Sequence, residues 1–160
     1  MNLSRVFLVS HLFAAASSTS LRGGHKHRDL NLFEDTRIIN GEEATEGRYS
    51  YAVSLQDKWG HFCGGSLIAP DVVLSAAHCA GGEYNAVIGR HNLTISNGDE
   101  VPVKVEMKHP EYDSDATDND FMLLFLERAT DEEVDFVHVG PEVPPVGTKV
   151  SVMGWGDTGT

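Results

Sequence analysis

The stretch that decides the fold is Cys63–Cys79, which reads Cys-Gly-Gly-Ser-Leu-Ile-Ala-Pro-Asp-Val-Val-Leu-Ser-Ala-Ala-His-Cys. Two mostly apolar runs, residues 66–69 and 72–75, flank the pair Pro70-Asp71. Apolar and branched residues on both sides of a pair that presets φ and accepts local hydrogen bonds favour a β-hairpin. The stretch therefore predicts a hairpin whose second strand leads to His78, directly before a cysteine.

The chain has two cysteines, Cys63 and Cys79. The residues alone leave two alternatives open, a disulfide or two reduced and buried cysteines. A bridge closing a loop of about 15 residues would stabilise the fold by roughly 3 kcal/mol in the chain-entropy model. A bridge would also indicate an oxidising compartment.

Length and charge narrow the class of protein. The chain has 160 residues, a formal net charge of −12 and a pI near 4.9. The length suggests one domain or a piece of a larger one. The acidic balance argues against a nucleic-acid partner, since such proteins need a basic footprint. Acidity alone identifies no other partner.

The N-terminus is typical of a secretory signal peptide over residues 1–18. Arg5 gives a short positive region, residues 6–9 and 12–16 are mostly apolar, and small residues follow. The apolar run is too short to span a bilayer, so no membrane partner is predicted. The sequence thus predicts a secreted, extracellular protein. Residues 19–37 are polar and aperiodic, as in a disordered linker.

Five segments together resemble the trypsin-like (chymotrypsin-family, S1) serine proteases. Residues 63–68 and 74–79 are similar to the region around that family's catalytic histidine, and residues 37–41, Arg-Ile-Ile-Asn-Gly, resemble its activation site. Residues 119–124, Asn-Asp-Phe-Met-Leu-Leu, resemble the segment with its catalytic aspartate, and 154–156 match its Gly-Trp-Gly turn. The motifs occur in the family's order along the chain.

The resemblance implies a serine endopeptidase that acts on protein or peptide substrates. His78 takes the place of the general base, and Asp120 that of the aspartate that orients it. The family's nucleophilic serine lies in a Gly-Asp-Ser-Gly-Gly motif, which this sequence lacks. Ser66 matches a structural position of the family, not the nucleophile. We therefore expect the 160-residue chain alone to be inactive.

The resemblance also implies a zymogen. Residues 19–37 then form a propeptide, and a trypsin-like protease cuts after Arg37 to free the amino group of Ile38. A buried ammonium needs a carboxylate partner, which is why such a pair can act as a switch. The resemblance and the signal peptide both favour the disulfide between Cys63 and Cys79.

The fold expected from the resemblance is all-β. It consists of a six-stranded antiparallel barrel at about residues 38–130, within a trypsin-like peptidase domain over 38–160. Residues 120–126 are almost wholly apolar and predict a strand buried on both faces. Residues 149–156 resemble the first strand of a second barrel, which is only begun.

Two accounts of the chain follow. In the favoured one it is the N-terminal part of a complete secreted protease, because an opening strand of a second barrel would otherwise leave unpaired edge groups. In the alternative it is a secreted non-catalytic protease homologue that serves as a binding or inhibitor module. The retention of Arg37-Ile38, His78 and Asp120, which catalysis needs, favours the first.

Two further patterns concern modification and metal binding. Asn92-Leu93-Thr94 is an N-glycosylation sequon, so Asn92 is a possible glycan site. The acidic run 113–118 lacks the glycine and terminal glutamate of an EF-hand loop, and we interpret it as a solvated loop. The sequence implies no metal ion and no organic cofactor.

Overall fold

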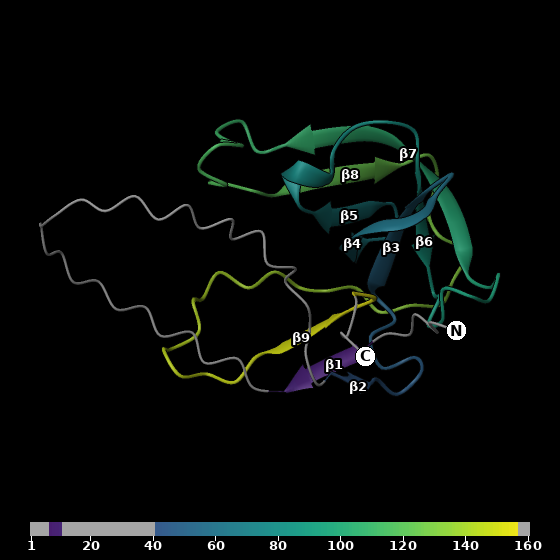
Figure 1. Cartoon of the computed structure of the whole chain (residues 1–160), viewed down its shortest axis with the longest axis horizontal. Coiled ribbons are helices and arrows are strands. Elements are labelled where there is room, and N and C mark those ends of the chain that lie inside the picture. Colours follow the sequence, from purple (N-terminus) through teal and green to yellow (C-terminus); the bar gives the residue numbers. More distant parts are fainter. Residues whose placement is uncertain (1–6, 11–40, 157–160) are drawn as a thin grey trace, which may run out of the picture.

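The computed structural model of the chain describes residues 7–10 and 41–156 (Figure 1). Strands form almost all of the regular structure within these ranges, together with one short 3-10 helix. The elements are β1 (Phe7–Ser10), β2 (Glu42–Glu43), β3 (Ala52–Asp57), β4 (Gly60–Ala69), β5 (Val72–Ser75), η1 (Ala77–Cys79), β6 (Asn85–Ile88), β7 (Asp99–Lys108), β8 (Met122–Leu126) and β9 (Ser151–Gly154).

Six of these strands close into a barrel in the order β3-β4-β5-β8-β7-β6 (Figure 1, upper half). Every neighbouring pair is antiparallel, and the pairing of β3 with β6 closes the ring. Closure removes exposed strand edges from the barrel. The prediction of an all-β fold built on a six-stranded antiparallel barrel is therefore confirmed.

The hairpin predicted from the central stretch is formed by β4 and β5, with Pro70 and Asp71 in the turn. Of its two adjacent glycines, Gly65 lies where the two strands approach most closely. A Cβ atom at Gly65 would lie 2.6 Å from Val73 Cγ1 and 3.1 Å from Leu74 O. Real Cβ atoms essentially never approach so closely, so this position requires glycine.

The barrel interior is filled by alternate residues of the strands. In β8, Met122, Leu124 and Leu126 point into the core and are buried, whereas Leu123 and Phe125 are half-buried. The expectation of a strand buried on both faces is thus wrong in part. A barrel wall has one face on the core, and the outer face of β8 is only partly covered.

A second, three-stranded sheet lies outside the barrel, in the order β2-β1-β9 (Figure 1, lower half). The strand predicted in residues 149–156 is present as β9, and it pairs with β1 rather than with any barrel strand. Trp155, which follows β9, packs against Ala44 and Ala52. Its indole Nε1 donates to His91 O at 2.9 Å, which joins the end of β9 to the loop that follows β6.

The N-terminal predictions fall largely outside the described residues. Of the predicted signal peptide, residues 1–18, only Phe7–Ser10 are described, as β1. The predicted propeptide, with Arg37, and the following Ile38 lie outside the described residues. Within the described ranges, no helix has the length and apolar character needed to cross a membrane.

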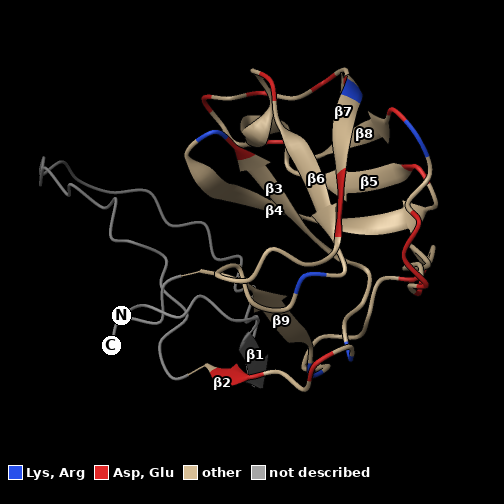
Figure 2. Cartoon of the chain, turned by 90° about the vertical axis from the view of Figure 1, so that its right-hand side faces the viewer, with Lys and Arg blue, Asp and Glu red and all other residues tan. Residues whose placement is uncertain are grey.

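Acidic positions outnumber basic ones over the described surface (Figure 2). Many of them lie in loops, including the run 111–118 and the run 131–135 after the barrel. Residues 138–150 are exposed and carry apolar side chains such as Val143 and Val146. The barrel therefore presents a largely anionic surface, with an apolar segment next to β9.

Candidate active site

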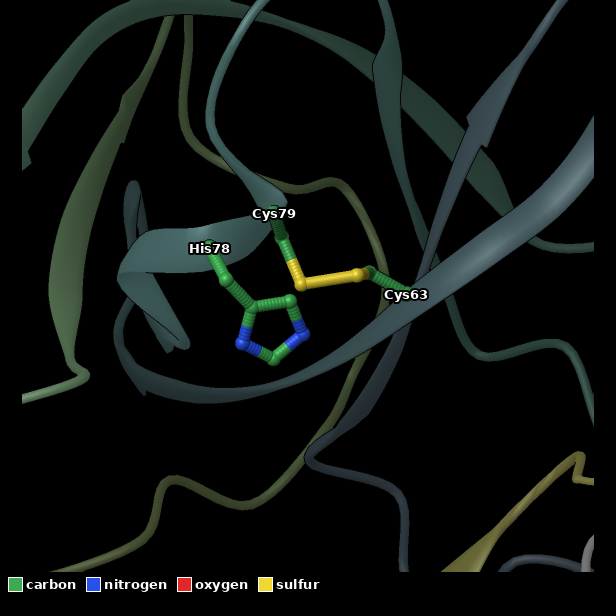
Figure 3. A group of neighbouring side chains, drawn as sticks. All are labelled: Cys63, His78 and Cys79. Carbon is green, nitrogen blue, oxygen red and sulfur yellow. A yellow bond between two sulfur atoms is a disulfide. The ribbon is translucent and has the colours of Figure 1, made fainter. Parts of the chain in front are cut away.

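The short helix η1 presents His78 at one end of the barrel. Ala77 and Cys79 on either side of it are buried, while the His78 side chain is 59% exposed. A disulfide joins Cys79 to Cys63 of β4, with the two Cα atoms 6.3 Å apart (Figure 3). The predicted disulfide is therefore confirmed, and it fastens the backbone next to His78 to a neighbouring strand.

The sheet register brings Asp120 to His78. Ser75, at the end of β5, pairs with Met122, at the start of β8. Asp120 comes two residues before β8, directly after Asn119, whose φ of 52° is in the left-handed region. Asparagine is among the residues that adopt this conformation at low cost. This local turn places the Asp120 carboxylate against η1.

Two hydrogen bonds join His78 and Asp120. His78 Nδ1 lies 2.6 Å from Asp120 Oδ2, and the His78 backbone N–H donates to Asp120 Oδ1 at 2.9 Å. The Asp120 side chain is only 18% exposed, so its carboxylate is largely screened from water. The structure thus brings together His78 and Asp120, which the family resemblance predicted to be a catalytic pair.

The hydrogen bond from the His78 side chain is the main cause that holds the pKa of Asp120 below its usual range. The backbone N–H of His78 lowers this pKa further, while burial acts in the opposite direction. An ionised carboxylate only accepts hydrogen bonds, so Nδ1 must carry the imidazole proton. Nε2 of the neutral ring is then left with its lone pair, ready to accept a proton.

An open cleft of about 650 Å³ lies beside His78 and the disulfide. Its apolar wall includes Phe62 and Tyr84, whose rings meet edge to face with centroids 5.2 Å apart. Its charged lining includes Asp57, Glu83 and the cationic Lys58. The cleft beside His78 therefore has an aromatic wall and charged groups of both signs.

Sequence reasoning missed Glu106, which holds the loop that follows the disulfide. Its Oε1 accepts hydrogen bonds from the Tyr84 hydroxyl at 2.5 Å and from the Gly81 backbone N–H at 2.9 Å. Burial and the neighbouring carboxylate raise the pKa of Tyr84, so its hydroxyl stays protonated as a donor. The partners of Glu106 lie 22 and 25 residues away along the chain, so no local sequence pattern indicated them.

Ser66 and Ser75 both lie in strands of the hairpin. Ser66 lies within β4, in register with Ala52 and Leu74. Ser75 is buried, and its hydroxyl donates to Gly64 O at 2.8 Å. The placement of Ser66 in the barrel wall fits the structural role expected for it.

Asn92 lies on the loop between β6 and β7. Its Oδ1 accepts hydrogen bonds from the Thr94 backbone N–H and hydroxyl, both at 2.9 Å. In the acidic run 113–118, Asp113 Oδ1 accepts backbone N–H bonds from Asp115 and Ala116. The carboxylate of Asp113 is thus used to shape its own exposed loop.

A histidine whose Nδ1 donates to a carboxylate, with Nε2 left open, has the same geometry as the histidine and aspartate of Ser-His-Asp hydrolases, an arrangement that occurs on chymotrypsin-type β-barrels. A sequence model of the trypsin family matches residues 38–160 of the chain. The chain therefore belongs to the trypsin family.

Individual relatives agree with this assignment. The chain is similar to Trypsin-3 of Salmo salar, 40% identical over 129 residues, which cover 78% of this chain and 53% of that protein. It is similar to Trypsin theta of Drosophila erecta, 40% identical over 156 residues, or 93% of this chain and 60% of that protein. It is also 35% identical to human Trypsin-3 over 129 residues, 78% of this chain and 42% of that protein. The chain thus spans about half the length of these relatives.

Proposed function

We propose that the chain belongs to a secreted serine endopeptidase in which His78 is the general base and Asp120 orients it. The double hydrogen bond between the two residues carries this proposal. Membership of the trypsin family supports the reaction class and substrates that are proteins or peptides. The cleft of about 650 Å³ beside His78 gives room for a substrate segment.

In the proposed reaction, His78 Nε2 takes the proton of a serine hydroxyl as that oxygen attacks the scissile carbonyl. The imidazolium then returns this proton to the leaving amine. Asp120 accepts from Nδ1–H throughout and stabilises the imidazolium. Because the 160 residues contain no Gly-Asp-Ser-Gly-Gly motif, we propose that this chain alone hydrolyses nothing efficiently.

Secretion and activation complete the proposal. Residues 1–18 act as a signal peptide, and residues 19–37 act as a propeptide that a trypsin-like protease removes after Arg37. The motif Arg37-Ile38-Ile39-Asn40-Gly41 supports this step. Limited proteolysis of the secreted protein tests it: N-terminal sequencing should give Ile38 as the new first residue, and an Arg37→Gln variant should stay uncut there.

The experiment that tests the enzymatic proposal starts with the 3′ end of the transcript. We expect the reading frame to continue into a Gly-Asp-Ser-Gly-Gly segment. The full protein, once activated, should then hydrolyse peptide esters, and His78→Ala should abolish turnover while the exposed His138→Ala keeps it.

Two outcomes would contradict parts of this proposal. A stop codon directly after Thr160 in expressed message would favour the non-catalytic binding module instead. Turnover of a peptide ester by the 160-residue chain itself, lost in His78→Ala, would show that the chain alone is active.

A further inference from the structure

Asn119, directly before Asp120, is held by both its backbone and its side chain. Its φ of 52° lies in the left-handed region, which residues other than glycine seldom adopt. Its side-chain Nδ2 donates to Glu111 O at 3.0 Å. We propose that Asn119 is a positioning residue of the site, whose side chain anchors the turn that aims the Asp120 carboxylate at His78. The inference rests on the proposed function, because it concerns the same pair.

The segment between β7 and β8 leaves the barrel and returns to it as two joined arms. The two strands pair as far as the end of β7 and the start of β8. One step outward, the His109 backbone N–H donates to Phe121 O at 3.0 Å. A further cross-connection is the bond from Asn119 to Glu111 O. Asp120 therefore lies between two fixed points of the returning arm, one residue on either side of it.

The main chain turns tightly at Asp120. The Phe121 backbone N–H donates to Asn119 O at 2.8 Å, so one hydrogen bond joins the two neighbours of Asp120. A three-residue turn of this kind fixes the direction in which its middle side chain leaves the backbone. The Asn119 backbone N–H donates in turn to Asp118 Oδ1 at 3.0 Å. The N–H, the C=O and the side-chain amide of Asn119 are thus all hydrogen-bonded at the turn.

The Asp120 carboxylate must meet two donors of His78 at once. Oδ2 lies 2.6 Å from Nδ1, and Oδ1 accepts the backbone N–H at 2.9 Å. Hydrogen bonds weaken steeply as their distance and angle depart from the ideal, so a displaced carboxylate cannot keep both bonds strong. Loosening the anchor at Glu111 O should therefore weaken the bond to Nδ1. This is the bond that holds the proposed general base in its tautomer.

Asparagine combines the two properties that this position requires. Among residues with a side chain, asparagine adopts the left-handed region at low cost, and its amide supplies the N–H that Glu111 O accepts. Glycine adopts the same backbone conformation but has no side-chain donor. Asn119→Gly therefore removes the anchor and keeps the turn, whereas Asn119→Ala removes the anchor and also disfavours the left-handed backbone.

The test is NMR of the His78 ring in the 160-residue chain, which requires neither the serine nor turnover. In the wild type, the Nδ1–H proton should resonate far downfield, because it lies in a short hydrogen bond to a carboxylate. In Asn119→Gly this signal should move upfield, and its exchange with water should become about 3- to 10-fold faster, the effect expected from losing one ordinary hydrogen bond. Asn119→Ala should enlarge both changes.

Thr117→Gly is the matched control. Thr117 is the other non-glycine residue with a left-handed φ, 55°, within the described ranges, and it lies on the same exposed loop. Its replacement should leave the His78 signal unchanged, whereas a general effect of changes in this loop would move the signal in both variants. Equal changes in Thr117→Gly, or an unchanged signal in an Asn119→Gly chain with the backbone spectrum of a folded barrel, would overturn the proposal.

A kinetic comparison separates this inference from the proposed function. In the complete activated protein, Asn119→Gly should lower kcat by a similar factor and leave KM unchanged, because the variant loses no contact with substrate. If the complete protein has no peptidase activity, the proposed function fails, and the NMR comparison still decides whether Asn119 positions the pair.

Discussion

Asp120 holds both the side chain and the backbone of His78. Oδ2 lies 2.6 Å from the ring Nδ1, and Oδ1 accepts the backbone N–H at 2.9 Å. Because one carboxylate makes both bonds, the position of the main chain and the orientation of the ring are coupled. The ring is therefore fixed by the loop before β8, which lies 42 residues further along the chain.

The first prediction concerns the tautomer of His78. In the wild type, nitrogen-15 chemical shifts at neutral or higher pH should show a proton on Nδ1, because Asp120 is an acceptor only. Asp120→Asn should give a mixture of tautomers, since an amide group can both accept and donate. Asp118→Asn, an exposed neighbour, is the matched control and should change nothing. A wild-type ring with its proton on Nε2 would contradict the assignment.

A second prediction uses the glycine pair of the hairpin. A Cβ at Gly65 would lie 2.6 Å from Val73 Cγ1, whereas at Gly64 the nearest atom, Val53 O, is 4.0 Å away. Gly65→Ala should therefore destabilise the fold by about 1 to 3 kcal/mol through overpacking. Gly64→Ala should cost much less. Urea unfolding of the two variants measures the difference, and equal losses would show that Gly65 is not tightly packed.

The central stretch illustrates how far sequence predicts this fold. Its hairpin follows from local chemistry, because turn residues and apolar runs act over a few neighbouring positions. His78 and Asp120 were identified by motif, since the family resemblance supplied their roles. The six-stranded barrel was likewise expected only through the resemblance.

Other features depend on contacts that no local pattern encodes. Glu106 and Tyr84 meet only because β7 runs beside the loop after the disulfide. The pairing of β9 with β1 joins segments from opposite ends of the chain. The outer face of β8 remained half-buried because the covering of a barrel wall depends on its surroundings, which the run of apolar residues does not report.

The third prediction concerns the disulfide. Replacing Cys63 with alanine should lower the free energy of unfolding by about 2 to 5 kcal/mol, the usual cost of removing a native disulfide from a small secreted domain. The double variant Cys63→Ala/Cys79→Ala should lose a similar amount, because the second cysteine has no other bridge to make within the described residues. Urea unfolding with and without reductant measures both. If the reduced wild type unfolded at the same urea concentration as the oxidised protein, the disulfide would not be a source of stability.

Asp99, at the start of β7, accepts hydrogen bonds from residues that follow β8. Arg128 binds it through both terminal nitrogens, and Thr130 and the Asp131 backbone N–H also donate to it. Mainly through the bond from Arg128, its pKa falls to about 2. This cluster fastens the start of β7 to the segment that leaves β8.

The last prediction follows from this lowered pKa. The folded-state value lies below the unfolded value of about 3.9. The contribution of Asp99 is therefore complete above about pH 5 and is lost as pH falls from about 4 to 2. The pKa difference corresponds to at most about 2.5 kcal/mol, and solvent around the half-exposed Arg128 reduces this to about 1 kcal/mol. Asp99→Asn should thus reduce the loss of stability on acidification, measured by thermal unfolding between pH 7 and 2. The control variant Asp131→Asn, at an exposed position, should lose nearly as much stability on acidification as the wild type.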